Sequence, residues 1–300
     1  MFKGSIVAIA TPFKKGKVDE TKLKELVEFQ IKSGTQGIVP CGTTGESPTL
    51  SHIEHARVIE LTIEAVNGRV PVIAGTGSNS TAEAIELTRH AAEAGATGAL
   101  IVSPYYNKPT QEGLYRHFKA IADAVKIPII LYNIAGRTAV NIEPATIARL
   151  AKECKNIIGV KEASGSLDQM QTIKVSCPKE FVLLSGDDAL TLPVLSIGGV
   201  GVISVAANIV PQDIRKVIDL FNEGKIAEAQ KTHNKLLPLL KTLFIETNPI
   251  PLKEAMGMLD MCSAELRLPL CPMADANRVK LKTALIEYGL LKAPPMAGQG

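Results

Sequence analysis

The sequence predicts an α/β fold, a (β/α)8 barrel of the TIM type with a C-terminal helical extension. Eight apolar, β-branched runs recur along the chain, and helical patterns fill the intervals between them. Each run is nearly continuous rather than alternating, which is typical of parallel strands covered on both faces. Strand–helix alternation repeated about eight times is the pattern of a closed barrel.

The predicted strands are, in chain order, residues 5–13, 37–42, 70–77, 98–104, 127–133, 157–164, 181–188 and 201–208. Helices are predicted over residues 19–34, 81–95, 110–125 and 143–154. Residues that favour helix ends, such as Thr81 at a start and Gly34 and Gly95 at a close, mark their limits. A doubly wound open sheet is the alternative. We favour the barrel because eight evenly spaced units fit closure, and the nearest thing to a dinucleotide fingerprint, GTGSNS, lacks the third glycine.

The strand pattern stops after about residue 223. The segments IAEAQKTHNKLLPLLKTLF and PIPLKEAMGML that follow have helical patterns, with prolines between them. We therefore expect two parts, a catalytic barrel over residues 1–223 and a helical extension over residues 224–300. The last eight residues, APPMAGQG, are predicted to be a frayed tail.

The composition indicates a cytosolic globular enzyme. The chain has 300 residues, 46% of them hydrophobic, and a net charge of +3, which suits a large core. Basic residues are scattered and tryptophan is absent, so nothing points to nucleic acid. The five cysteines include no C-x-x-C pair and are read as reduced thiols, most of them small core residues. No signal peptide and no membrane span is predicted.

Polar residues collect where the predicted strands end, and in such a barrel the chemistry is built at these ends. These residues are Thr43, Thr44, Ser78, Asn79, Tyr105, Tyr106, Tyr132, Arg137, Lys161, Gly186, Asp187 and Asp188. Each has an ordinary structural interpretation, such as a tight turn for GTTGES or a solvated loop for Arg137. Together, at one mouth, they favour a catalytic site.

Lys161 is the most informative of them because it stands at the tip of a buried strand. It could form a structural ion pair, and Glu162 is the neighbouring carboxylate. Successive strand residues point to opposite sides, however, so Glu162 cannot easily share the barrel interior with Lys161. Desolvation favours the neutral amine, which is a nucleophile. Lys161 could then form a Schiff base with a ketone, Tyr132 and Thr43 could relay protons, and Thr44 and Arg137 could hold carboxylates.

Four separated motifs give this site a family resemblance. GTTGES (42–47), PYYN (104–107), YN-x-x-GRT (132–138) and GVKEASG (159–165) together resemble the dihydrodipicolinate (4-hydroxy-tetrahydrodipicolinate) synthase family. The resemblance runs from about residue 2 to residue 291 and includes GDD and NPIPLKEAM. It implies a lyase that condenses pyruvate with L-aspartate-4-semialdehyde in lysine and diaminopimelate biosynthesis. We expect no cofactor and no metal.

The resemblance also implies roles for single residues. Lys161 matches the Schiff-base lysine, Tyr132 and Thr43 match two members of the proton relay, and Tyr106 matches a third member that comes from a neighbouring subunit. Arg137 matches the arginine that binds the semialdehyde carboxylate. Thr44, Gly186 and Ile203 match contacts near the substrate. The borrowed tyrosine implies a dimer unit, and the usual family assembly is a homotetramer of two dimers. Ala135 replaces a proline common in the family, so the Arg137 loop is expected to be less rigid.

A second site is indicated by six residues that match the feedback-lysine site of inhibitable family members. These are Ser47, His52, His55, Asn79, Glu83 and Tyr105. Pro48 stands where an alanine is familiar, which puts the affinity for lysine in doubt. His52 and His55 could instead be a polar helix face, or ligands of a metal that would lack an evident third ligand.

Three other functions compete with the synthase. A related aldolase or lyase acting on sugar acids would share the barrel, the lysine and the tyrosine, although Thr44, Tyr106 and Arg137 favour the synthase. A silent barrel acting as a binding subunit would be supported by loss of Lys161 or Tyr132. A pyridoxal-phosphate barrel would need a late phosphate-binding loop, for which Gly198–Gly201 is a weak candidate.

Overall fold

The computed structural model describes residues 2–292, and the predicted tail over residues 293–300 lies outside the described residues. Eight parallel strands form one sheet in the order β4-β1-β10-β9-β8-β7-β6-β5. They are β1 (Gly4–Ala8), β4 (Gly37–Val39), β5 (Ile73–Gly75), β6 (Gly98–Val102), β7 (Ile129–Asn133), β8 (Ile157–Glu162), β9 (Val182–Ser185) and β10 (Gly201–Ser204). A parallel bridge between Ile38 and Val72 joins the two outer strands. The sheet is therefore closed, which confirms the barrel against the open sheet.

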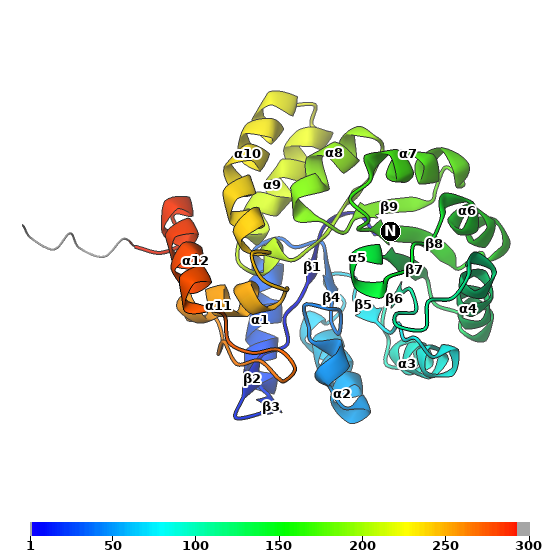
Figure 1. The fold of residues 1–300 in the computed structure, drawn as a ribbon, viewed down its shortest axis with the longest axis horizontal. Coiled ribbons are helices and arrows are strands. Elements are labelled where there is room, and N and C mark those ends of the chain that lie inside the picture. The colour runs from blue at the N-terminus through cyan, green and yellow to red at the C-terminus, as the bar shows by residue number, and fades with distance from the viewer. Residues whose placement is uncertain (1, 293–300) are drawn as a thin grey trace, which may run out of the picture.

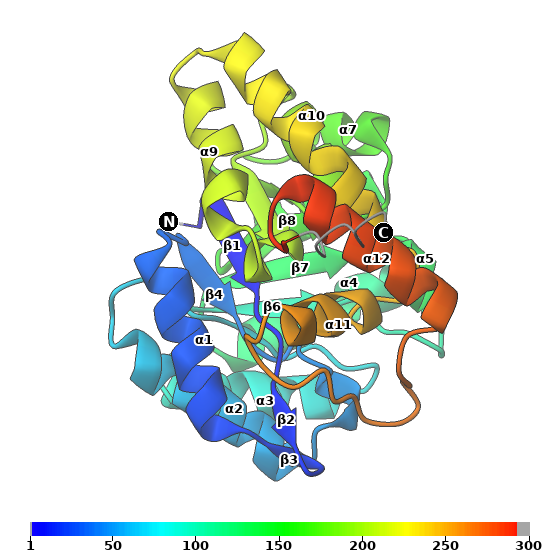
Figure 2. The ribbon, with the colours of Figure 1, turned by 90° about the vertical axis from the view of Figure 1, so that its left-hand side faces the viewer.

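Helices surround the strands, and α10, α11 and α12 gather on one side of the barrel (Figures 1 and 2). The helices are α1 (Glu20–Lys32), α2 (His52–Val66), α3 (Thr81–Glu93), α4 (Gln111–Ala124), α5 (Ala135–Thr138), α6 (Pro144–Glu153), α7 (Leu167–Ser176), α8 (Thr191–Ser196), α9 (Pro211–Asn222), α10 (Ile226–Thr242), α11 (Ile250–Met258) and α12 (Asp275–Tyr288). Three short 3-10 turns are η1 (Ser47–Thr49), η2 (Asp188–Leu190) and η3 (Ala206–Asn208). The four predicted helices are confirmed within two residues at each end.

The apolar runs are continuous because each strand has two buried faces. Ile6, Leu100 and Leu184 belong to the cluster that fills the barrel interior. Their neighbours along the same strands, such as Val7 and Ile101, belong to the clusters between the sheet and the helices. The interior cluster also includes Tyr132, near the carboxyl end of β7.

The first predicted strand was too long. The strand β1 ends at Ala8, and Phe13 instead opens a small antiparallel hairpin, β2 (Phe13–Lys14) and β3 (Lys17–Val18). Pro12 lacks a backbone N–H and cannot continue a sheet ladder. Gly16, with φ 77°, supplies the left-handed residue that the tight turn needs.

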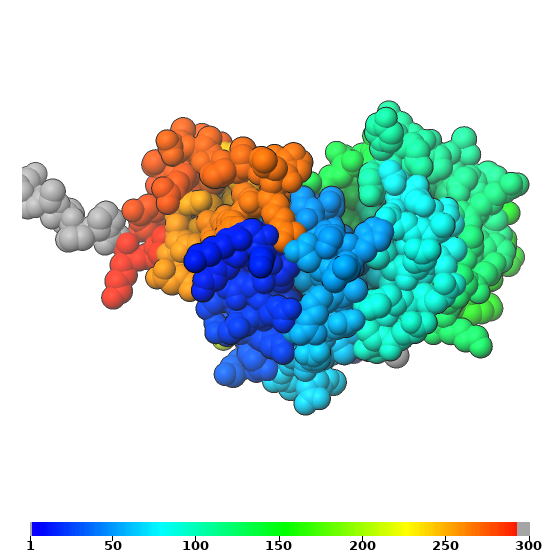
Figure 3. Space-filling model, turned by 90° about the horizontal axis from the view of Figure 1, so that it is seen from below, coloured from blue at the N-terminus to red at the C-terminus, as the bar shows by residue number. Residues whose placement is uncertain are grey.

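The C-terminal helices share the barrel's outer core. Leu236 of α10, Leu252 of α11 and Leu281 of α12 are fully buried in the same cluster as Val7 and Val27. In Figure 3 the C-terminal residues (orange) lie directly against N-terminal residues (dark blue). The division into residues 1–223 and 224–300 stays a prediction.

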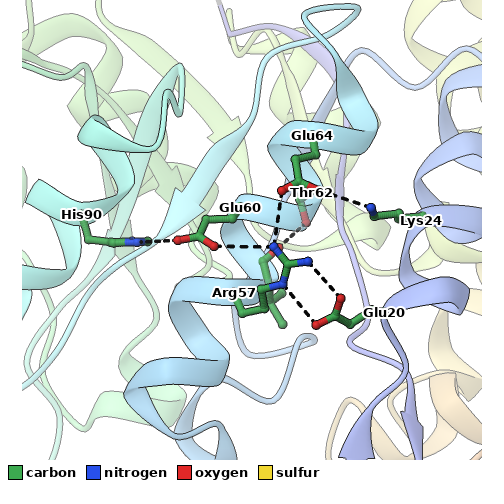
Figure 4. Close-up of polar contacts among 8 residues, drawn as sticks. Glu20, Lys24, Arg57, Glu60, Thr62, Glu64 and His90 are labelled. Atoms are coloured by element: carbon green, nitrogen blue, oxygen red, sulfur yellow. Dashed lines mark hydrogen bonds and ion pairs between the residues drawn. The ribbon is translucent and has the colours of Figure 1, made fainter.

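A surface network of charges ties α2 to its neighbours on both sides (Figure 4). The Arg57 guanidinium donates to both carboxylate oxygens of Glu20 on α1, at 3.1 and 3.0 Å. It also donates to Glu64, while Glu60 pairs with His90 on α3 at 3.0 Å. Exposed pairs of this kind add little stability each, and together they connect α2 to α1 and to α3.

Candidate active site

Six of the predicted site residues meet at the carboxyl ends of the strands. They line a cavity of about 40 Å³, and they are Thr43, Thr44, Tyr132, Arg137, Lys161 and Gly186. Asn248 and Phe244 from the C-terminal extension also line it. The cavity is buried and small, which suits a ligand with few atoms.

Lys161 points into the barrel between two neighbouring strands. In the sheet it stands beside Tyr132 of β7 and Leu184 of β9, and its side chain is 5% exposed. The Nζ atom lies 4.2 Å from the centre of the Tyr132 ring. Burial lowers the pKa of Lys161 to about 7, with the Asp188 charge opposing this shift and the Arg137 charge adding to it. Much of the amine is therefore neutral, and nucleophilic, near neutral pH.

Glu162 lies on the other side of the barrel wall. Its carboxylate accepts hydrogen bonds from Asn133 Nδ2 at 2.9 Å, the Ser164 amide at 2.7 Å and Gln169 Nε2 at 3.3 Å. Within residues 2–292, no carboxylate oxygen lies within 4.0 Å of Lys161 Nζ. The alternation of strand side chains correctly separated the two residues, and the structural ion pair does not form.

Tyr132 is the phenol nearest to the amine. Burial raises the pKa of Tyr132 to about 12, and Arg137 and the hydroxyl of Thr43 act in the opposite direction. The Tyr132 phenol therefore keeps its proton at neutral pH and can donate it, while the Thr43 hydroxyl is placed to pass protons on. Thr43 and Tyr132, the two residues expected to form a proton relay, thus line the same cavity.

Asn248 links the two residues expected to bind carboxylates, and the sequence reading gave it no role. Its Nδ2 donates to Thr44 Oγ1 at 3.1 Å, and its backbone oxygen accepts from Arg137 Nη2 at 3.1 Å. Arg137 sits on α5, a single helical turn, rather than on an open loop. The NPIPLKEAM motif was the available signal, but nothing in it says that Asn248 reaches a threonine 204 residues away.

Gly186 and Ile203 have different places in the site. A Cβ at residue 186 would lie 2.6 Å from the Ala163 Cβ and 3.2 Å from the Lys161 Cε, so only glycine leaves room for the lysine. Ile203 is buried in the barrel interior beside Ile6 and does not line the cavity.

Tyr106 does not reach the cavity of its own chain. Its side chain is 89% exposed and its backbone has φ 71°. A large tyrosine held in this unfavourable conformation at the surface fits a residue that serves another subunit, which stays a prediction.

A larger cavity of about 400 Å³ adjoins the first and shares Thr43, Tyr132 and Arg137 with it. Five of the six residues expected to bind lysine line it, namely Ser47, His52, His55, Glu83 and Tyr105. Asn79 does not line this cavity, and its Nδ2 donates to the Tyr105 carbonyl oxygen at 3.2 Å.

The two histidines of the larger cavity do not converge as metal ligands. His52 Nε2 pairs with Glu83 at 3.0 Å, whereas His55 Nε2 donates to the Gly75 carbonyl oxygen at 3.0 Å. Burial lowers the pKa of His55 to about 4, although the hydrogen bond to Gly75 opposes this. His55 is therefore neutral at physiological pH. The part of the chain that the structure describes holds no group of three metal-ligating side chains.

The glycines of the late loop lie at the opposite end of the barrel from Lys161. Gly198 and Gly199 follow α8 and precede β10, so they stand at the amino end of that strand. A phosphate bound there would be a barrel length from the amine, which argues against the pyridoxal-phosphate alternative.

The depressed pKa of Lys161 gives a direct prediction. Only the neutral amine attacks a carbonyl, so we expect kcat/KM for a keto acid to fall about tenfold for each pH unit below 7 and to level off above it. Initial rates between pH 5 and 9, together with borohydride trapping at short times, measure this. A midpoint near 10, or a flat profile, would contradict it.

Comparison with known proteins decides the family. The model of the dihydrodipicolinate synthetase family matches residues 1–288. A 4-hydroxy-tetrahydrodipicolinate synthase from Endomicrobium trichonymphae is 62% identical over 292 residues, which are 97% of this chain and all of the relative. The chain belongs to the dihydrodipicolinate synthetase family. The resemblance drawn from the four motifs is confirmed over nearly the whole chain.

Solved members of the dihydrodipicolinate synthetase family share the fold. The chloride-inhibited enzyme from Acinetobacter baumannii, complexed with pyruvate, is 46% identical with a TM-score of 0.94, covering 97% of this chain and 100% of that one. The Cyanidioschyzon merolae enzyme with lysine bound is 43% identical with a TM-score of 0.95, covering 97% and 99%. A monomeric variant is also among the matches, at 42% identity and a TM-score of 0.94, covering 97% and 98%. Across residues 2–292 no helix combines the length and apolar character needed to cross a membrane.

Proposed function

We propose that this chain is a 4-hydroxy-tetrahydrodipicolinate synthase, which condenses pyruvate with L-aspartate-4-semialdehyde in lysine and diaminopimelate biosynthesis. The observation that supports this most is the buried Lys161 amine, whose pKa burial lowers to about 7, next to the protonated phenol of Tyr132. Schiff-base chemistry needs these two groups together. The family membership and the pyruvate bound by a relative agree with the choice of keto acid.

The reaction begins at the pyruvate carbonyl. The lone pair of Lys161 Nζ forms a bond to C2, and the carbonyl oxygen takes a proton from Tyr132 through the relay. The attacking nitrogen gives up one of its two protons, which reaches the same oxygen through the relay, and loss of that oxygen as water leaves an iminium ion. Asn248 donates to Thr44 Oγ1, which leaves the Thr44 hydroxyl hydrogen available to donate to the pyruvate carboxylate.

The iminium makes the methyl group acidic, and loss of a proton gives an enamine. The enamine carbon bonds to the aldehyde carbon of the semialdehyde, whose oxygen takes a proton. Attack of the semialdehyde amine on C2 then closes the ring and releases Lys161. Arg137, exposed at the mouth, would hold the semialdehyde carboxylate, with backbone groups of Gly186 and Ile203 beside the substrate.

Borohydride trapping with pyruvate tests the proposal. Intact-mass and peptide mass spectrometry should find a reduced pyruvyl adduct on Lys161, and aspartate semialdehyde should outcompete sugar aldehydes as the acceptor. An adduct followed by preference for a sugar aldehyde would favour the sugar-acid lyase. No adduct, under conditions that trap a known pyruvate aldolase, would favour a silent binding barrel.

We propose a homotetramer built from two dimers, located in the cytoplasm. The exposed Tyr106 supports the dimer because it would complete the partner's proton relay. A monomeric variant exists in the family, so the assembly needs its own measurement. Sedimentation that gave only a monomer at micromolar concentration, or activity found in a membrane fraction, would contradict these assignments.

We further propose feedback inhibition by lysine at the larger cavity. Glu83 would accept from the lysine ammonium, and Ser47 and Tyr105 would meet its polar groups. Millimolar lysine should lower turnover and raise the melting temperature. In Glu83→Gln, both effects should need at least tenfold more lysine. Glu86→Gln, on the same helix, is the control. Unchanged turnover together with no thermal shift would refute inhibition.

A further inference from the structure

An ion pair with no exposed surface joins the C-terminal extension to the turn that bears Thr43 and Thr44. Lys253 of α11 and Glu46 are both 0% exposed, and Lys253 Nζ lies 2.7 Å from Glu46 Oε1. The ammonium also donates to the Thr11 carbonyl oxygen at 3.0 Å and lies 4.1 Å from the centre of the Phe13 ring. Burial lowers the pKa of Lys253, and Glu46 opposes that shift.

The second oxygen of the Glu46 carboxylate is also used. Glu46 Oε2 accepts from the backbone amide of Arg267 at 3.2 Å. Its backbone has φ 52°, a left-handed conformation that is unfavourable for a residue other than glycine. The side-chain contacts therefore hold the backbone in a conformation that it would not adopt unaided.

That backbone is continuous with the catalytic turn. The Glu46 amide donates to the Thr43 carbonyl oxygen at 3.1 Å, and Thr11 Oγ1 donates to the Gly45 carbonyl oxygen at 2.7 Å. Five residues before Lys253, Asn248 donates to the Thr44 hydroxyl. Asn248, just before α11, and Lys253, on α11, thus bind the turn at Thr44 and at Glu46.

We infer that Glu46 and Lys253 are positioning residues for the reaction, and that their buried pair sets the two threonine hydroxyls against Lys161 and Tyr132. The inference rests on the proposed function. Neither residue lines the cavity, so they act through Thr43 and Thr44. A buried ion pair is weak evidence for stability, because well-packed apolar residues often replace such a pair without loss. What apolar residues cannot supply is the directed set of bonds that fixes this backbone.

The test separates stability from positioning with four variants. Glu46→Gln and Lys253→Met each break the pair, and the double variant E46M/K253M replaces it with two unbranched apolar side chains. Glu254→Gln is the matched control, since Glu254 is the next residue on α11 and pairs with Arg278 at 2.6 Å, away from the site. The melting temperature of each variant is measured. Exhaustive borohydride trapping with pyruvate then gives the concentration of active sites. KM is measured directly, and kcat is calculated per trapped site.

We expect each single variant to lose about 10²-fold in kcat/KM for pyruvate per trapped site, since a displacement of about 1 Å in a positioned group can cost that much. The KM for the semialdehyde should stay within about twofold, because Asn248 still holds Arg137. E46M/K253M should melt at a higher temperature than either single variant, but its turnover should be no higher than theirs. Glu254→Gln should match the wild type.

Recovery of turnover along with melting temperature in E46M/K253M would overturn the inference, because the pair would then be merely structural. If the double variant does not fold, Glu46→Gln decides alone, and wild-type turnover per trapped site overturns the inference. Failure of the wild type to trap pyruvate would instead refute the proposed function.

Discussion

Lys161→Ala is expected to lower kcat/KM for pyruvate by about 10³-fold or more and to remove the borohydride-trapped adduct, because among residues 2–292 no other lysine lines the cavity. Rates of product formation and intact mass after trapping measure the two effects. The buried side chain becomes smaller and loses a costly buried amine, so the melting temperature should not fall with the activity. Lys216→Ala, at an exposed position of α9, is the control and should match the wild type. An adduct on another lysine at the wild-type rate would refute the assignment.

Tyr132→Phe should lower kcat by about 10²- to 10⁴-fold, the usual contribution of a positioned acid–base group. The ring that packs beside Lys161 remains, so the fold and slow adduct formation should survive. Stopped-flow trapping with pyruvate would locate the lost rate in the proton-transfer steps. Tyr115→Phe is the control, because Tyr115 is also a largely buried tyrosine but donates to Glu153 on the outside of the barrel. Equal losses in both variants would indicate a general packing effect.

The sequence predicted most of the barrel because its information is local. A strand covered on both faces must be apolar throughout, and strand alternation alone placed Lys161 inside the barrel and Glu162 outside it. The sequence predicted less well where a single residue changes the path of the chain. Pro12 and Gly16 make residues 13–18 a hairpin instead of part of the first strand. Arg137, expected on a loop, lies on the single helical turn α5.

The supports of the site could not be read from local patterns. Asn248 and Lys253 reach Thr44 and Glu46 across 204 and 207 residues of sequence, and only tertiary packing brings them together. The GTTGES motif contains Glu46, but nothing local in it indicates a partner on α11. Asn79, expected at the lysine site, does not line the larger cavity, and its side chain donates to the Tyr105 backbone; its role toward lysine stays a prediction.

The contacts of Asn248 and Lys253 with the turn after β4 have a consequence for the order in which the site forms during synthesis. Chains grow from the amino end at about 5–20 residues per second, and their parts begin to fold as they emerge. All eight strands and Lys161 emerge before Asn248 and Lys253 do. A nascent chain can therefore contain all eight strands while the turn with Thr43 and Thr44 still lacks its bonds to Asn248 and Lys253. On the positioning role inferred for Glu46 and Lys253, full activity requires that α11 has left the ribosome, and unfinished chains would contain Lys161 without the bonds that position Thr43 and Thr44.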